Sequence, residues 1–143
     1  MAKLTKSVFI SAPPEKPFNY IDDPTNLPEI WPSFVEAKDV ERLPTGGSKF
    51  GWTYKMAGIR FDGTTDTIEY EANQRIVTQN EGGVSSVITW TFELQGDGTK
   101  VTFEADYTVN LPMLRKLAES VLVKANEQEA ETLLANLKSK IEA

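Results

Sequence analysis

The alternation of apolar and polar residues in the second half of the chain constrains its fold most strongly. Residues 87–94, VITWTFEL, and residues 101–109, VTFEADYTV, place large apolar side chains at every second position. Successive side chains of a strand point to opposite faces, so each stretch has one apolar, aromatic face and one mainly polar face. Such strands form an antiparallel sheet with one face buried and the other in water. The pattern therefore predicts a sheet that needs a cover on one face only.

Turn-forming segments divide the centre of the chain into six strand-like runs. Breaks such as LPTGGS at 43–48 and QGDGT at 95–99 are short and rich in Gly. They favour hairpins between strands that follow each other in the sequence, and hence an antiparallel meander. A further strand is expected over residues 3–10, which makes seven. The six central strands are expected at 34–43, 49–56, 60–70, 75–80, 84–94 and 100–109.

Two short helices are expected between the first strand and the others. Residues 11–23, SAPPEKPFNYIDD, contain prolines and a glutamate that suit the first turn of a helix. In the next segment, 24–34, Asn26 followed by Glu29 resembles a capping box. Pro32 disfavours helical geometry at the residue before it, so this second helix is expected to end after little more than one turn.

The last part of the chain is predicted to be one long helix. After Pro112 there is no Gly or Pro, and Leu, Ala, Glu and Lys are frequent, which predicts a helix over about 113–141. A helix of roughly 29 residues is about 43 Å long but only about 10–12 Å wide, whereas seven strands span roughly 29 Å. One helix cannot cover such a sheet, so the sheet must curl round it while the short helices close another side. We therefore expect a cavity between the sheet and the long helix.

The apolar stripe of this long helix is interrupted near its middle. It includes Leu117 and Val121, but its continuation meets polar residues from Gln128 onwards, and the later apolar residues centre on another side. One interpretation places Gln128 and Thr132 at a wet pocket or its mouth. The other is a kink near residues 126–129, or a helix end that changes its packing partner.

Aromatic residues on the apolar face are the candidates for lining the cavity. They either fill a solid core or surround a ligand, and the shortage of helix cover favours the second interpretation for the set as a whole. Tyr54 and Tyr107 stand out because a buried phenol needs a hydrogen-bond partner and can orient a ligand. The candidate ligand-binding residues are Trp31, Phe34, Phe50, Trp52, Tyr54, Trp90, Phe92, Tyr107, Leu117, Val121 and Gln128.

Polar residues on the central strands are weaker candidates. Asp62 and Asp66 share one face of a strand, but exposed carboxylates opposite basic neighbours are commoner than catalytic pairs. The sequence therefore marks no catalytic residue. A slip of one residue in strand register turns a side chain to the other face. The polar residues whose direction depends on this register are Thr65, Thr67, Thr78 and Asn80.

Composition excludes several kinds of function. The chain has neither Cys nor His, which excludes disulfides, thiolate nucleophiles, Cys-ligated metals and imidazole bases. No acidic loop has EF-hand spacing, so we expect no cofactor and no metal. The net charge of −6 argues against nucleic acid and anionic membrane as partners. No apolar run is long enough for a bilayer and no apolar leader is visible, so we expect a cytoplasmic location without stable membrane insertion.

Several segments, taken in order, resemble one known superfamily. They are VFISAPPEKPFNYIDDPTNLPEIWPSF at 8–34, GGSKFGWTYKMAG at 46–58, VITWTFEL at 87–94 and GDGTKVTFEADY at 96–107, followed by the terminal helix. The pattern resembles the START-related SRPBCC superfamily with the helix-grip fold, and within it the polyketide cyclase/dehydrase and lipid transport branch. The resemblance implies an α+β fold in a single domain over 1–143. In this fold a seven-stranded antiparallel curved sheet wraps round a long C-terminal helix, and two short helices follow the first strand.

The resemblance and the expected cavity lead to three functional hypotheses. The first is binding of a small hydrophobic ligand, whether aromatic, polycyclic or lipid-like, by a monomer or homodimer. The second is an enzyme of the polyketide cyclase or dehydratase type, which an inward carboxylate beside a tyrosine would favour. The third is a co-chaperone-like interaction module, which requires a contiguous exposed apolar patch. We favour the first hypothesis, because it follows directly from the aromatic inner face.

Overall fold

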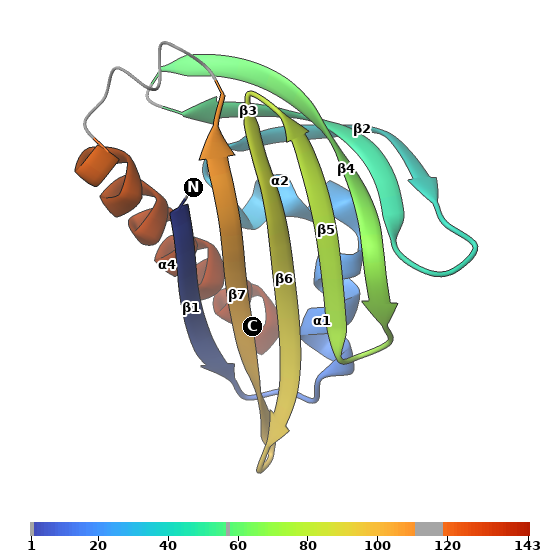
Figure 1. Ribbon diagram of the computed structural model, residues 1–143. Helices are drawn as coiled ribbons and strands as arrows, with labels where there is room; N and C mark the ends of the chain where they lie inside the picture. Colours follow the sequence, from blue (N-terminus) through green and yellow to red (C-terminus); the bar gives the residue numbers. More distant parts are fainter. Residues whose placement is uncertain (1, 57, 111–118) are drawn as a thin grey trace.

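The computed structural model of the protein describes residues 2–56, 58–110 and 119–143 (Figure 1). Its strands form a single sheet in the order β1-β7-β6-β5-β4-β3-β2. The central strands form the expected meander, and β1 joins its edge beside β7. The elements are β1 (Ala2–Ile10), α1 (Glu15–Asp22), the 3₁₀ helix η1 (Pro24–Asn26), α2 (Leu27–Ile30), β2 (Phe34–Arg42), β3 (Ser48–Met56), β4 (Ile59–Glu71), β5 (Arg75–Gly82), β6 (Val84–Gln95), β7 (Gly98–Val109) and α4 (Glu119–Glu142).

This architecture confirms the predicted fold class. The sheet has seven strands, every adjacent pair is antiparallel, and each predicted strand corresponds to an observed one. Turn chemistry and alternation are local signals, which is why they located all the hairpins. The expected long helix is observed from Glu119 onwards, and the predicted residues 113–118 lie outside the described part of the chain.

The helices lie together on the concave side of the sheet (Figure 1). Helix α4 packs mainly along β1 at one edge of the sheet, and it also contacts α1, α2 and β7. The short helices lie behind the other strands in Figure 1, where α2 packs against β2. The sheet is therefore covered by a long helix near one edge and by short helices near the other.

The end of the second short helix follows the prediction. Trp31 is in the extended region (φ −105°, ψ 105°), and α2 stops at Ile30. The proline at position 32 explains this, because its ring clashes with helical geometry at the preceding residue. Trp31 is thereby turned out of the helix and towards the sheet.

The predicted capping box is wrong. Asn26 makes no capping hydrogen bond with its side chain, and its amide instead donates to the main-chain oxygen of Tyr20 at 3.0 Å. Glu29 accepts a hydrogen bond from the Tyr20 hydroxyl at 2.9 Å. The cap lies one turn earlier, where the Asp23 carboxylate accepts from the main-chain N–H of Thr25 at 3.0 Å. Both residues of the expected capping box thus bond to Tyr20 of α1 and not to the main chain of α2.

Alternation along β6 and β7 produces the core, as predicted. Trp90 and Phe92 of β6, and Val101, Phe103 and Ala105 of β7, are all buried. Leu94 shares this face but is 67% exposed. Figure 1 shows the reason, because the β6–β7 hairpin extends beyond the helices that cover the rest of the sheet.

The sheet bends at glycines and at irregular pairings. Gly63 of β4 pairs with Gly82 of β5 on one side and with Trp52 of β3 on the other. Register shifts occur in the β2–β3 pair and between Thr67 and Glu69 of β4. Such bulges and glycines increase local bending and twist, so they account for the curl of β2, β3 and β4 towards the helices (Figure 1).

Candidate functional site

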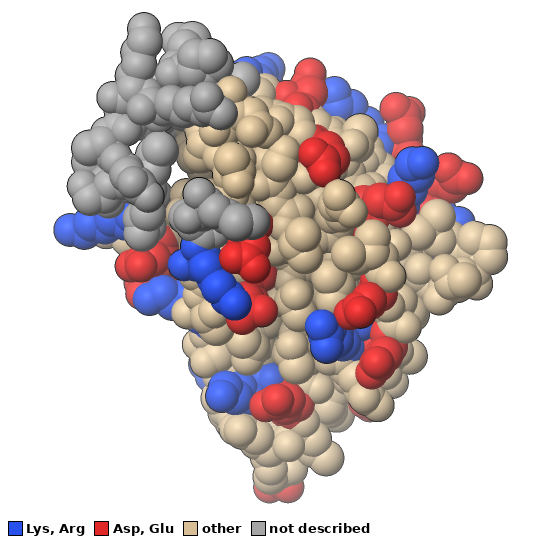
Figure 2. Space-filling view, in the orientation of Figure 1, with Lys and Arg blue, Asp and Glu red and all other residues tan. Residues whose placement is uncertain are grey.

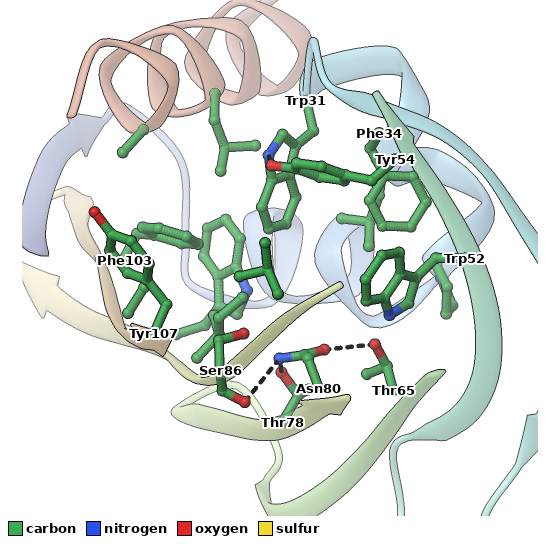
Figure 3. Close-up of a pocket in the computed structure, with 18 of the residues that line it drawn as sticks. Trp31, Phe34, Trp52, Tyr54, Thr65, Thr78, Asn80, Ser86, Phe103 and Tyr107 are labelled. Carbon is green, nitrogen blue, oxygen red and sulfur yellow. Dashed lines mark hydrogen bonds between the residues drawn. The ribbon is translucent and has the colours of Figure 1, made fainter. Parts of the chain in front are cut away.

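A cavity of about 140 Å³ lies between the concave face of the sheet and helix α4. Its walls come from all seven strands of the sheet, from α4, and from the end of α1 to the segment after α2. Figure 3 shows the indole and phenyl rings of Trp31, Phe34 and Trp52 on one side of this space and those of Phe103 and Tyr107 on the other. The expected cavity is therefore present, although its volume is below the ~300–1,000 Å³ usual for sites that bind drug-sized ligands.

Most of the predicted aromatic residues meet at this cavity. Phe92 is the exception, because it is buried outside the lining, with its ring 5.3 Å from that of Phe18 and 6.5 Å from that of Trp90. Its predicted place in the lining is therefore wrong, since α1 fills the space next to it. The predicted residues that line the cavity are Trp31, Phe34, Phe50, Trp52, Tyr54, Trp90 and Tyr107.

The prediction for the long helix needs correction at Gln128. Residues 126–129 are helical within α4, and Gln128 is exposed and lies outside the lining. Thr132 is exposed too, and its hydroxyl donates to the main-chain oxygen of Gln128 at 2.9 Å. Leu117 lies outside the described residues, as does the side chain of Val121. Among the described side chains of α4, those that line the cavity are Asn126, Glu129, Ala130 and Leu133.

A row of paired residues crosses the cavity floor. The observed register pairs each member with its neighbour on the next strand, and all members line the cavity. The observed register turns Thr65 and Asn80 inward. Thr67 and Thr78, whose direction the sequence also left open, belong to the lining as well. Ser86 was not foreseen, because only the observed pairing places it beside Asn80. From β3 to β7, the cross-sheet row consists of Phe50, Thr65, Asn80, Ser86 and Tyr107.

Asn80 satisfies the polar groups in the middle of this row (Figure 3). Its side-chain oxygen accepts a hydrogen bond from the Thr65 hydroxyl. Its amide nitrogen donates to the Thr78 hydroxyl at 3.2 Å and to the main-chain oxygen of Ser86 at 3.5 Å. A buried amide left without partners would cost free energy, so this network explains how polar residues are accommodated under an apolar cavity.

Tyr107 is different, because its hydroxyl is unsatisfied. The side chain is 7% exposed, and the oxygen has no hydrogen-bond partner among the described residues. An unpaired buried hydroxyl costs roughly 1–3 kcal/mol. In Figure 3 the Tyr107 hydroxyl points away from the Asn80 network, towards the side of α4. Tyr107, a residue of the cavity lining, therefore carries a buried hydroxyl with unused hydrogen-bonding capacity.

A second polar cluster fixes α4 to the opposite wall. The Glu129 carboxylate accepts hydrogen bonds from the main-chain N–H of Ser33 at 2.9 Å, the Ser33 hydroxyl at 2.6 Å and the Tyr54 hydroxyl at 3.2 Å. The Tyr54 oxygen in turn accepts from the Trp31 indole N–H at 2.6 Å. The inward carboxylate beside a tyrosine, which sequence alone did not establish, is therefore present in the structure.

Comparison with protein families agrees with this geometry. A family profile described as polyketide cyclase / dehydrase and lipid transport matches residues 1–142. The chain belongs to this family. The resemblance found in its sequence is thereby confirmed. Among curated proteins, none matches the sequence.

Solved structures share the fold of this family member. A START superfamily protein from Mycobacterium smegmatis has a TM-score of 0.81 and 19% identity, and the match covers 98% of this chain and 97% of that one. A protein from Thermus thermophilus has a TM-score of 0.76 and 22% identity over 98% and 97% of the two chains. The Zhui aromatase/cyclase from a Streptomyces species, strain R1128, has a TM-score of 0.77 and 15% identity over 99% and 93%. At these identities the similarity concerns the fold alone.

Two further carboxylates of this family member, Asp22 and Asp62, are each paired with a basic side chain. The Asp22 carboxylate, which lies at the cavity edge, accepts from the Arg42 guanidinium at 3.0 and 3.1 Å and from the Tyr70 hydroxyl at 2.8 Å. Asp62 is exposed and bonds to Thr53 and Lys38. Among the described residues, no group of three or more carboxylates could hold a metal ion. No helix within the described part of the chain is long and apolar enough to cross a membrane.

The Tyr54 cluster leads to a prediction about alkaline stability. Burial, followed by the negative charge of Glu129, raises the pKa of Tyr54 well above its usual value near 10. Above pH 10 the unfolded chain loses this proton while the folded protein keeps it. The free energy of unfolding therefore falls as pH rises, with a contribution from Tyr54 of about 1.4 kcal/mol per pH unit.

Urea unfolding at several pH values between 9 and 11 measures this slope. Tyr54→Phe is expected to show a shallower decrease than the wild type, because it lacks the group that titrates. The pKa of Tyr20 is also raised, to about 12, through burial and its bond to Glu29. Tyr20→Phe is therefore expected to make the decrease shallower as well, because the folded protein also keeps the Tyr20 proton over this pH range. Equal slopes for the wild type and Tyr54→Phe would contradict the assignment.

Proposed function

We propose that the protein binds a small hydrophobic, aromatic molecule in the cavity between the sheet and α4. The apolar cavity, lined by aromatic rings and by Ala130 and Leu133 of α4, is the observation that carries this proposal. A cavity of about 150 Å³ with apolar walls can bind benzene in other proteins. The volume of about 140 Å³ therefore favours a compact ligand over a polycyclic or two-chain one.

The tryptophans make this proposal directly testable. The chain has 3 tryptophans, and Trp31, Trp52 and Trp90 all line the cavity. Tryptophan emission therefore reports occupancy, and titration with toluene and with naphthalene is expected to change it saturably. Native mass spectrometry of the purified protein adds an independent search for small molecules that co-purify. No saturable change with either hydrocarbon would contradict the proposal.

A pair of alanine substitutions provides a matched control. Ala105 is buried and lines the cavity, whereas Ala12 is buried elsewhere in the core. Ala105→Leu fills the cavity and is expected to weaken toluene binding at least about tenfold, because the space for the ring is lost. Ala12→Leu overpacks a site without a cavity and is expected to cost about 1–3 kcal/mol of stability while leaving binding intact. Equal weakening in both variants would show that binding occurs elsewhere.

The enzymatic alternative rests on a different observation. The Tyr54 phenol and the Glu129 carboxylate share a hydrogen bond at the cavity wall, and a proton-transfer pair has this kind of geometry. A polyketide-like chain of about 20 heavy atoms, however, exceeds a cavity of about 140 Å³. If the protein is a cyclase, Tyr54→Phe or Tyr107→Phe is expected to reduce turnover of a poly-β-keto thioester at least about tenfold. Unchanged turnover in both variants would exclude this role for the two phenols.

The interaction-module alternative has less support. The exposed large apolar side chains include Phe9 of β1, Ile68 of β4 and Leu94 of β6, which lie on three different strands. Figure 2 shows acidic and basic side chains mixed over the outer face of the sheet. A docking surface for a protein partner usually presents a contiguous apolar patch. The single domain over 1–143, the cytoplasmic location and the monomeric or homodimeric state stay predictions.

A further inference from the structure

The residues that line the cavity indicate the chemical class of its ligand, in addition to the size of that ligand. This step rests on the proposed binding function. Three features of the cavity bear on it: the charge of Glu129 in its wall, the unpaired hydroxyl of Tyr107, and the small volume. Together they restrict which aromatic molecules can bind.

The charged groups in the wall are acidic. Among the described lining residues there are two carboxylates, Asp22 and Glu129, and neither Lys nor Arg. Asp22 is paired with the Arg42 guanidinium at 3.0 Å, which neutralises its charge. Glu129 accepts hydrogen bonds only from the neutral groups of Ser33 and Tyr54 among the described residues. The cavity therefore has one negative charge in its wall that no described cation balances.

This charge is close to any bound molecule, because the cavity is small. A sphere of about 140 Å³ is only about 6–7 Å across, so a ligand inside it lies within a few ångströms of the lining. Two like charges about 6 Å apart, at an effective dielectric constant of about 20, repel enough to weaken binding roughly 100-fold. Glu129 is thus expected to exclude a ligand that carries a carboxylate.

Tyr107 supplies the attractive part of the selection. Within the cross-sheet row, Asn80 bonds to the Thr65 hydroxyl and to the main-chain oxygen of Ser86, but the Tyr107 hydroxyl is buried without a partner among the described residues. A phenol both donates and accepts hydrogen bonds. A ligand with a carbonyl or hydroxyl group removes the cost of this unpaired group when it binds.

We infer that the cavity selects an uncharged, single-ring aromatic molecule with one carbonyl or hydroxyl substituent, that Tyr107 binds this substituent, and that Glu129 excludes the corresponding carboxylates. Substituted phenols and aryl ketones belong to this class. Aromatic hydrocarbons without a polar substituent fit the cavity but leave the Tyr107 hydroxyl unpaired. Aromatic carboxylates also fit the cavity, but they place their negative charge near Glu129.

Three probes of nearly equal shape separate these effects. Acetophenone, isopropylbenzene and benzoate each consist of one ring with a branched substituent of three heavy atoms, and they differ in polarity and charge. The indole N–H signals of Trp31, Trp52 and Trp90 in NMR spectra at pH 7 measure the dissociation constant of each probe. Comparison of each variant with the wild type for the same probe removes the differences in hydrophobicity between the probes.

Tyr107→Phe is expected to weaken acetophenone binding roughly three- to tenfold, while isopropylbenzene binds as well as or better than to the wild type. Glu129→Gln is expected to strengthen benzoate binding roughly 10- to 100-fold and to leave isopropylbenzene almost unchanged. Glu104→Gln, at an exposed pair on the outer side of β7, is the control for net charge and is expected to change benzoate binding less than twofold.

The results distinguish this inference from the proposed function. If isopropylbenzene binds the wild type but Tyr107→Phe changes acetophenone and isopropylbenzene alike, or Glu129→Gln leaves benzoate excluded, the inference is wrong and the binding function stands. If none of the three probes shifts the indole signals of the wild type, the proposed function fails and the inference fails with it.

Discussion

Substitution of Gly63 by alanine is expected to destabilise the protein by about 3 kcal/mol, which corresponds to roughly 10 °C in Tm for a domain of this size. An added Cβ at this position would overlap the indole of Trp52 and the main-chain oxygen of Glu81. Trp52 is buried and Glu81 contributes its backbone, so neither has room to withdraw. Gly63 thus allows Trp52 to lie across the sheet at the point where β3, β4 and β5 come close.

A neighbouring glycine isolates this effect. Gly51 lies on β3 of the same sheet, and a Cβ there would meet its nearest atoms at 3.7 and 3.8 Å, which is ordinary contact. Gly51→Ala is therefore expected to change stability by less than about 1 kcal/mol. Urea unfolding curves of the two variants measure the difference. If Gly51→Ala and Gly63→Ala were equally stable, packing against Trp52 would not be the reason for glycine at position 63.

The sheet could be predicted from sequence because its signals are local. Alternation along β6 and β7, and the glycine-containing breaks between the runs, depend only on neighbouring residues, and all seven strands were found. Pro32 likewise determined where α2 ends, because its effect on Trp31 is a covalent constraint. These features need no knowledge of how distant parts of the chain pack.

The errors arose where tertiary packing decides. Gln128 was expected in the cavity because the stripe on the helix was extended as if α4 lay over the centre of the sheet. Helix α4 instead packs along β1, which turns Glu129 and Leu133 inward and leaves Gln128 exposed. Phe92 was expected in the lining because it alternates correctly, but Phe18 of α1 covers it. Sequence defines a face of each element, whereas the position of the neighbouring helix defines which part of that face meets the cavity.

The cross-sheet row shows a second kind of limit. Thr65 and Asn80 are opposite each other because of the observed β4–β5 register, which also contains a bulge between Thr67 and Glu69. A one-residue change in this register would turn the polar side chains outward. Turn positions in the sequence are not known to one residue, so the direction of these side chains stayed open until the pairing was observed. The polar part of the candidate site therefore depends on register, and the aromatic part on alternation.

Leu133→Ala is expected to have a large effect on both stability and ligand size. Leu133 is 0% exposed and lines the cavity from α4. Loss of a buried leucine side chain costs about 2–5 kcal/mol, and here the lost volume adds to an existing cavity. Binding of naphthalene is expected to strengthen at least about tenfold relative to toluene, because the larger cavity accommodates a second ring. Urea unfolding and tryptophan emission measure the two effects.

Leu137→Ala is the matched control for this prediction. Leu137 is also 0% exposed and lies one turn further along α4, but it does not line the cavity. Its truncation is expected to cost a similar ~2–5 kcal/mol and to leave the preference between toluene and naphthalene unchanged. The two variants thus lose stability for the same reason, whereas only one of them enlarges the ligand space. A parallel change of preference in both would mean that loosening of α4, rather than the shape of the cavity, controls which ligand binds.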